Sequence, residues 1–237
     1  MKKLIATNIS LFLFLFGISQ HIEKEFQYID TNLFQDNAHH WYDILEKEAV
    51  IKPKQNQPKY TATQLVEVAN NVLLYQKNNG GWPKNYDIMA ILSPEQKDSL
   101  LTTKKTTNTT FDNRTTYSHV ALLCKVYYTI KDERYKAAAL KGLDFILQSQ
   151  YENGGWPQYY PLQNNYSRYI TFNDDAMAGI MQLLKEISDN KKQFAFIDDE
   201  RKAKLKIAFD KGLNCILKMQ INDRGKPTVW CQQHNEI

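Results

Sequence analysis

Apolar residues recur every three to four positions along most of the chain beyond residue 60. This spacing places them on one face of an α-helix and predicts helices in five segments. The apolar rows that carry the prediction are Leu65/Val68/Val72, Val120/Leu123/Tyr127, Tyr135/Ala138/Ala139, Met177/Ile180/Leu184 and Leu205/Phe209/Ile216. No segment shows the strict alternation of a half-buried strand, so the pattern predicts an all-α fold. Asp132 and Asp198 stand where helix N-caps are expected, each followed by acidic residues.

An internal repeat runs through these segments. The turn sequence Gly80-Gly81-Trp82-Pro83 recurs as Gly154-Gly155-Trp156-Pro157, and a third tryptophan, Trp230, follows at the same interval of 74 residues. The segment 141–150 resembles 211–220, and Thr110-Phe111-Asp112-Asn113 resembles Thr171-Phe172-Asn173-Asp174. One unit cannot bury both faces of its helices, so the units must pack on one another. We therefore expect an α/α toroid, an incomplete ring of helical hairpins whose long loops gather at one end.

The first sixty residues differ from the rest. Lys2 and Lys3 precede an apolar run from Leu11 to Ile18, which predicts a signal peptide over residues 1–20 and a secreted or periplasmic protein. A membrane anchor is the alternative, but the run is shorter than the roughly 20 residues of a spanning helix, so we expect no membrane attachment in the mature form. Residues 21–59 are interpreted as an N-terminal extension and linker, and residues 60–237 as one domain.

Composition narrows the function. Hydrophobic residues make up 43% of the chain and aromatic residues 12%, which is enough for a buried core. The formal net charge of +4 is too small to indicate a nucleic-acid partner. Three cysteines form neither a disulfide framework nor a CxxC metal pair, and Cys124 and Cys215 are predicted to lie in the core.

The repeated loops offer two kinds of chemistry. Trp82 and Trp156 either pack under their glycine turns or present an aromatic face to a sugar ring, and Lys84 is either solvated or paired with a substrate carboxylate. The pairs Asp112-Asn113 and Asp174-Asp175 either cap the following helices or supply the oxygen ligands that calcium prefers. Their recurrence at equivalent repeat positions favours a shared calcium site. Trp230-Cys231-Gln232-Gln233-His234 contains no recognisable triad, and His39-His40-Trp41 is interpreted as surface or helix-start chemistry.

Four stretches taken together resemble the pectate lyases of polysaccharide lyase family 10. They are Asn79–Asn85, Thr110–Asn113 with Thr115-Thr116, Asn153–Pro161 running on to Ile170–Met177, and Trp230–His234. The resemblance spans about residues 60 to 237 and implies a helical, toroid-like fold. It also implies calcium-dependent cleavage of polygalacturonate by β-elimination, giving 4,5-unsaturated oligogalacturonides.

The resemblance also implies roles for individual residues. Calcium ligands map onto Asp112, Asn113 and Asp174. Substrate-binding residues are expected at Lys84, Trp82, Trp156, Arg168 and Asp175. The family's base, an arginine that removes the C5 proton, is expected beyond Ile237, and neither Arg114 nor Arg168 is assigned to it. We therefore expect a monomeric fragment of a longer product, weak or inactive as a lyase on its own.

Three alternatives remain open from the sequence. A polygalacturonate-binding α/α module would retain the polymer without turnover. A structural helical repeat would bury Trp82, Trp156 and Trp230 and hold the Asp112 and Asp174 loops apart. A glycoside hydrolase would use a carboxylate pair, for which Asp112 and Asp174 are candidates, and would give a saturated product.

Overall fold

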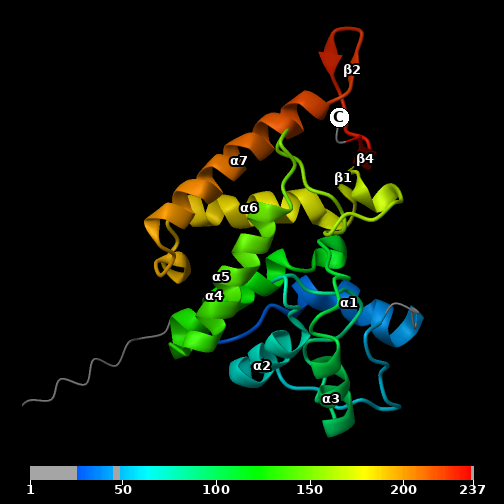
Figure 1. The fold of residues 1–237 in the computed structure, drawn as a ribbon, viewed down its shortest axis with the longest axis vertical. Helices are drawn as coiled ribbons and strands as arrows, with labels where there is room; N and C mark the ends of the chain where they lie inside the picture. Colours follow the sequence, from blue (N-terminus) through cyan, green and yellow to red (C-terminus); the bar gives the residue numbers. More distant parts are fainter. Residues whose placement is uncertain (1–25, 45–48, 236–237) are drawn as a thin grey trace, which may run out of the picture.

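The computed structural model describes residues 26–44 and 49–235 (Figure 1). The predicted signal peptide lies outside the described residues. The α-helices are α1 (Gln35–His39), α2 (Leu65–Tyr75), α3 (Pro94–Thr102), α4 (Tyr117–Ile130), α5 (Glu133–Gln148), α6 (Ala176–Ser188) and α7 (Asp199–Met219). Short helical turns are η2 (Thr31–Phe34), η3 (His40–Ile44), η4 (Asp112–Arg114), η5 (Tyr166–Arg168), η6 (Asn173–Asp175) and η7 (Lys192–Phe194). The strands are β1 (Ile170–Thr171), β2 (Asn222–Asp223), β3 (Lys226–Pro227) and β4 (Gln233–His234). The predicted all-α character is confirmed.

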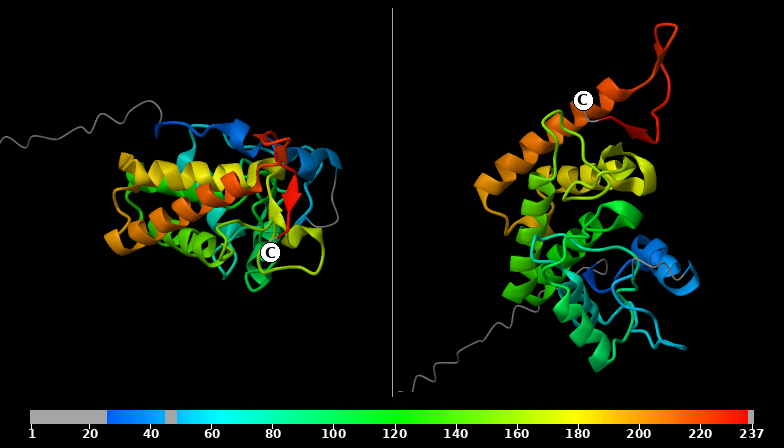
Figure 2. Two further views of the ribbon diagram at one scale, coloured as in Figure 1. Left: turned by 90° about the horizontal axis from the view of Figure 1, so that it is seen from above. Right: turned by 45° about the vertical axis from the view of Figure 1, so that its right-hand side comes forward.

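The helices stack along the long axis of the molecule (Figures 1 and 2). α4 packs against α5, and α6 packs against α7, so each unit contains a helical hairpin. α2, α5 and α7 precede the three tryptophans and contact one another in succession, while α4 and α6 form a second row. The sequence repeat is therefore a repeat of structure.

The N-termini of α5 and α7 confirm the predicted caps. The Asp132 carboxylate accepts a hydrogen bond from the Arg134 amide, and the Asp198 carboxylate accepts one from the Arg201 amide. Each cap satisfies a backbone donor that the first helical turn leaves unpaired. Exposed acidic residues follow in both first turns, where the helix dipole favours negative charge.

The described part of the N-terminal segment belongs to the same core as the helices. Phe34, Trp41 and Ile51 are buried within it, and the Trp41 indole donates to the Ile51 carbonyl at 2.7 Å. The boundary expected at residue 59 therefore does not separate two packing units. Cys124 and Cys215 are buried as predicted.

The last helix of the row differs from the one before it. Leu143 of α5 is fully buried, whereas Leu213, which holds the equivalent position in α7, is 43% exposed.

None of the helices in the described ranges is both long and apolar enough to cross a membrane.

Candidate metal and carboxylate site

Each Gly-Gly-Trp-Pro turn fixes the start of an acidic turn. The Thr110 amide donates to the Trp82 carbonyl at 3.0 Å, and the Thr171 amide donates to the Trp156 carbonyl at 3.1 Å. These bonds are made at equivalent positions of the two units. The acidic turns η4 and η6 therefore leave the scaffold with the same local geometry, and they contact one another.

The prediction that Trp82 and Trp156 bind substrate is wrong in this structure. Both side chains are 0% exposed. Their indole N–H groups donate to the carbonyls of Val72 and Ile146, at 2.8 and 2.9 Å. Neither ring has a free face for a sugar, so both tryptophans act as scaffold under the loops, the alternative that the sequence left open.

Close backbone approach explains the glycines of these turns. Gly80 and Gly154 have φ of +100° and +99°. A Cβ atom on Gly80 would lie 2.4 Å from the Lys141 carbonyl oxygen, and one on Gly154 would lie 2.2 Å from the Lys211 carbonyl oxygen. Only glycine tolerates both the conformation and the contact, so each turn packs closely against the middle of a helix of the next unit, α5 or α7.

The two acidic turns superimpose in conformation. Asn113 and Asp174 have φ of 49° and 51°, and the residues after them, Arg114 and Asp175, both have φ of 58°. Within the described residues, neither α4 nor α6 receives a side-chain cap, so the alternative in which the pairs Asp112-Asn113 and Asp174-Asp175 cap these helices is not supported. Backbone held in this sparsely populated region is common where side chains must be aimed at a ligand.

Lys84 and Asp112 form the most buried charge pair of the site. Lys84 Nζ lies 2.6 Å from Asp112 Oδ2, and the two side chains are 16% and 3% exposed. Burial acts to raise the pKa of Asp112, but the Lys84 ammonium, together with the neighbouring Gln158 and Asp174 side chains, outweighs it and holds the pKa below its ordinary value. The second oxygen of this carboxylate, Oδ1, is buried and has no close hydrogen-bond partner among the described residues. A buried, unpaired carboxylate oxygen is costly and favours a further cation.

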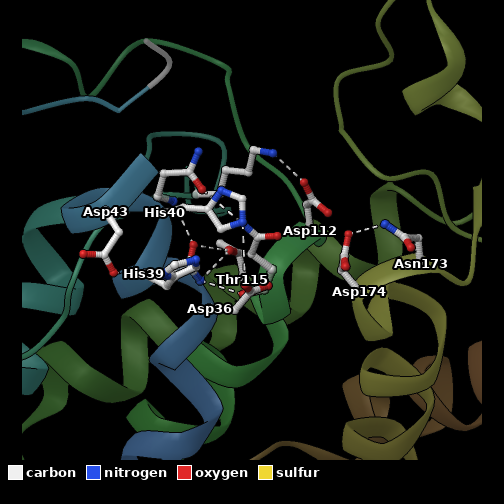
Figure 3. A network of polar contacts seen from close by, with 12 residues as sticks. Asp36, His39, His40, Asp43, Asp112, Thr115, Asn173 and Asp174 are labelled. Atoms are coloured by element: carbon white, nitrogen blue, oxygen red, sulfur yellow. Dashed lines mark hydrogen bonds and ion pairs between the residues drawn. The ribbon is translucent and has the colours of Figure 1, made fainter. Parts of the chain in front are cut away.

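Asp174 lies beside Asp112, with its carboxylate held by Asn173 (Figure 3). Partial burial raises the pKa of Asp174 to about 6, and the neighbouring Asp112 carboxylate adds to the increase. We call Lys84, Asp112 and Asp174 the acidic site. Its two carboxylates share one ammonium, so the local charge is suited to one more positive ion.

The donor set fits a calcium ion in part. Asp112 and Asp174 supply hard carboxylate oxygens of the kind that calcium takes. No group of three or more acidic, histidine or cysteine side chains in the described ranges is arranged around one metal position. The Asn113 side chain is buried and donates to Asn85 Oδ1 at 3.0 Å. Calcium here would therefore draw its remaining oxygens from the Asn113 amide oxygen, backbone, water or substrate.

Asp175 and Arg168 are placed differently from Asp174. Asp175 Oδ2 pairs with Arg114 Nη2 at 2.8 Å, and both side chains are about half exposed. Arg168 lies in η5, where its carbonyl accepts a hydrogen bond from the Tyr151 hydroxyl. Arg168 is not among the residues that line the cleft in front of Asp174. The structure thus brings Lys84, Asp112, Asp174 and Asp175 together and leaves Arg168 on a separate loop.

A cleft of about 940 Å³ opens in front of Asp174. The N-terminal segment forms one wall, with Asp36 and His39 among its residues, and the Trp-Cys-Gln-Gln-His motif forms another. The full lining is Asn32, Gln35, Asp36, His39, Arg114, Phe172, Asn173, Asp174, Asp175, Trp230, Cys231 and Gln232. The N-terminal wall was not foreseen, because a short polar segment carries no repeat or spacing that ties it to loops far along the chain.

The Trp230–His234 motif reaches the cleft through strand pairing. β4 pairs antiparallel with β1, with Thr171 opposite Gln233. The Phe172 amide donates to the Gln232 carbonyl at 2.9 Å, and the Gln232 side chain donates to Asn173. The motif therefore supports the η6 turn that carries Asp174.

Comparisons with a family model and with solved structures point to the same family of proteins. The family model described as pectic acid lyase matches residues 76–237. Two structures of a family 10 polysaccharide lyase from Cellvibrio cellulosa resemble 72% of the chain at 34% sequence identity. The TM-score is 0.64 for an aspartate-to-alanine mutant in complex with trigalacturonic acid and 0.62 for the other. The chain spans 51%, about half, of each of those proteins. A search of curated protein sequences found no match.

Proposed function

Because this chain belongs to the pectic acid lyase family, we propose that it provides the calcium- and carboxylate-binding part of an enzyme that cleaves polygalacturonate by β-elimination. The products would be 4,5-unsaturated oligogalacturonides. The observation that carries the proposal is the acidic site, where Asp112 and Asp174, from equivalent turns of two units, lie together beside Lys84. The similarity to a lyase complexed with trigalacturonic acid supports the choice of polymer.

The residues of the acidic site divide the work. Asp112 and Asp174 would hold the calcium ion, with Asn113 a further predicted ligand. Calcium bound there would supply positive charge against the C6 carboxylate of a galacturonate unit, which acidifies the C5 proton. Lys84 donates a hydrogen bond to Asp112. Its ammonium would also donate to the C6 carboxylate of the substrate. Arg114 and Asp175 link η4 to η6 through their ion pair.

The base is assigned only by the family resemblance. An arginine on the C-terminal side of the Trp230–His234 motif would remove the C5 proton, as expected from the sequence. Arg114 is paired with Asp175, and Arg168 lies outside the cleft lining. We propose that the 237 residues hold the metal and substrate carboxylate, and that this chain by itself turns over weakly or not at all.

The fold and location follow from the same proposal. Stacked hairpins with one row of α2, α5 and α7 and another of α4 and α6 are what an incomplete α/α toroid requires. The exposed Leu213 of α7 supports an open side of this ring at α7. Residues 1–20 would direct export, so we propose a secreted or periplasmic monomer that meets its polymeric substrate outside the cytoplasm.

The test combines binding and turnover. Calcium and polygalacturonate binding to this chain are measured by calorimetry, and unsaturated product is followed by its ultraviolet absorbance, for this chain and for any longer product of the same gene. Calcium-dependent product from the longer form confirms the lyase. Calcium-dependent binding without product from either form favours the binding module, and a saturated product indicates hydrolysis. No calcium or polymer binding by either form refutes the proposal.

The mutations Asp112→Asn and Asp174→Asn locate the site. Each keeps the side-chain size and removes one negative charge from the acidic site. Both should weaken calcium binding, whereas Asp223→Asn, on the exposed β2 strand, should leave it unchanged. Equal binding by all three variants would place the calcium site elsewhere.

A further inference from the structure

The N-terminal segment makes a contact with the acidic site that the family match does not cover. That match begins at residue 76, whereas η2 and α1 end by His39. Both elements nevertheless contact the η4 turn that carries Asp112. Asp36 and His39 of this segment face the cleft, while Asn37 between them is 1% exposed. The segment therefore presents one side to the cleft and buries the other against the site.

Both the nitrogen and the oxygen of the Asn37 carboxamide form hydrogen bonds with the backbone near the acidic site. Its Nδ2 donates to the Asn113 carbonyl at 2.7 Å and to Thr115 Oγ1 at 3.0 Å. Its Oδ1 accepts from the Asn85 amide at 2.8 Å. One side chain thus joins the residue after Lys84 to the residue after Asp112, and these are the two loops whose charged side chains meet.

The loops that Asn37 joins are held in sparsely populated backbone conformations. Asn85, Asn113, Arg114 and Thr116 all have φ between 49° and 64°. Such conformations persist only where surrounding contacts determine them. The Asn113 side chain closes the arrangement by donating to Asn85 Oδ1 at 3.0 Å. Without Asn37, the buried Asn113 carbonyl and Asn85 amide would each lose a partner.

We propose that Asn37 is a positioning residue for the acidic site: it fixes the distance between the Lys84 loop and the Asp112 loop. Asn37 itself lies in the N-terminal segment, outside the region that the family model matches. The role rests on the proposed function, since it matters to calcium binding only if Asp112 is a ligand. Figure 3 shows the polar network in which the N-terminal residues, Thr115 and Asp112 lie together. Outer hydrogen-bond partners of this kind orient the groups that bind a metal.

The experiment compares two buried asparagines in the 237-residue chain. Asn37→Ala removes the proposed positioning contact. Asn71→Ala is the matched control, because Asn71 is 2% exposed and its Nδ2 donates to two carbonyls, of Ile88 and Ala90, away from Asp112. Calcium affinity is measured by calorimetry under conditions in which circular dichroism shows all proteins folded. Amide hydrogen exchange is followed over residues 110–118.

We expect Asn37→Ala to weaken calcium binding by about tenfold or more and Asn71→Ala to change it by less than about twofold. Exchange over 110–118 should accelerate in the first variant and stay unchanged in the second. Wild-type calcium affinity in folded Asn37→Ala would overturn the proposal, as would equal losses in both variants. If Asn37→Ala does not fold, Asn37→Ser, which keeps one donor, takes its place with the same expected order.

Failure of the proposed function and failure of the positioning role of Asn37 give different experimental results. If the wild-type chain binds neither calcium nor polygalacturonate, the proposed function fails. The exchange measurement still decides whether Asn37 positions the η4 turn, because it needs no ligand. Unchanged exchange over 110–118 in the Asn37 variants would reject the positioning role even where calcium binds to the wild type.

Discussion

Arg114 and Asp175 hold equivalent positions in the two acidic turns and are joined by an ion pair of 2.8 Å. Each follows a residue with positive φ, Asn113 in η4 and Asp174 in η6. The pair therefore links the two units at the point where their loops meet, directly beside the proposed calcium ligands. Because both side chains are about half exposed, the pair contributes little to stability.

Asp174 and Asp175 are adjacent but should respond differently to mutation. Asp174→Asn removes a proposed ligand and should weaken calcium binding by about tenfold, or about 1.4 kcal/mol. Asp175→Asn removes only the partner of Arg114 and should change calcium affinity by less than about threefold, in keeping with an exposed pair worth at most about 1 kcal/mol. Calorimetric titration measures both. A loss for Asp175→Asn as large as that for Asp174→Asn would make Asp175 a ligand.

Lys84→Met should have opposite effects on the two partners of the site. The ammonium of Lys84 neutralises Asp112 and so competes with a metal ion, while it attracts a substrate carboxylate. We expect tighter calcium binding without polymer and weaker binding of polygalacturonate, each by severalfold. Lys59→Met is the control, because Lys59 pairs with buried Asp87 at 2.9 Å away from the acidic site. A change of both affinities in the same direction would contradict this prediction, and a change in only one of them would show that Lys84 acts on that partner alone.

Gly142→Ala should destabilise the protein although alanine favours a helix. The added Cβ would lie 2.5 Å from Val120 Cγ2 and 3.0 Å from Trp82 Cζ3, both in the packed core. Overpacking of this kind costs about 1–3 kcal/mol, against a gain of about 1 kcal/mol in helix propensity. Urea unfolding measures the net loss.

Gly212→Ala is the matched comparison for Gly142→Ala. Its Cβ would meet Met181 Sδ at 2.5 Å and Trp156 Cζ3 at 2.9 Å. The flexible methionine can move aside, so the loss of stability should be smaller than for Gly142→Ala. The reverse order would mean that the Trp156 contact, rather than the first neighbour, sets the cost.

His119 should make the protein acid-sensitive. The ring is fully buried, stacks on Trp82 and lies 2.8 Å from the Tyr86 hydroxyl through Nε2. Burial lowers the pKa of His119 from 6.5 to about 3. The unfolded chain therefore binds a proton below pH 6.5 that the native state refuses until about pH 3. The stability is present above pH 6.5 and falls by up to about 1.4 kcal/mol per pH unit below it.

The contribution of His119 is isolated by difference. Asp174 acts in the opposite sense, because its pKa is raised to about 6 and the native state binds its proton first. Unfolding free energies at pH 7 and pH 5 are therefore compared between wild type and His119→Gln, which should lose less stability on acidification. His39→Gln, an exposed histidine beside Asp43, should behave as wild type. Equal pH dependence in all three would show that His119 does not control acid sensitivity.

Local patterns predicted the elements of the fold. The spacing of apolar residues predicted the helices, and Asp132 and Asp198 predicted two of their N-termini, because helix periodicity and capping depend on neighbours in the sequence. The repeat also placed Asp112 and Asp174 in equivalent turns. That step needs only that similar sequences fold alike, and the two turns agree in φ to within a few degrees.

Side-chain direction was decided by tertiary structure. Trp82 lies under Gly142 of α5, and Trp156 lies under Gly212 of α7, so each ring is buried by a helix of the next unit. A turn sequence alone cannot show whether a later helix will cover its tryptophan. The substrate-binding role predicted for these rings failed for that reason.

The sequence by itself determined the helical repeat, its acidic turns and the family to which the chain belongs, because each is written in short motifs and their order. Only the tertiary structure decided that Lys84 meets Asp112 across 28 residues and that Asn37 meets Asn113 across 76. Contacts at such separations depend on how loops are packed against one another. No periodicity or local preference encodes that packing.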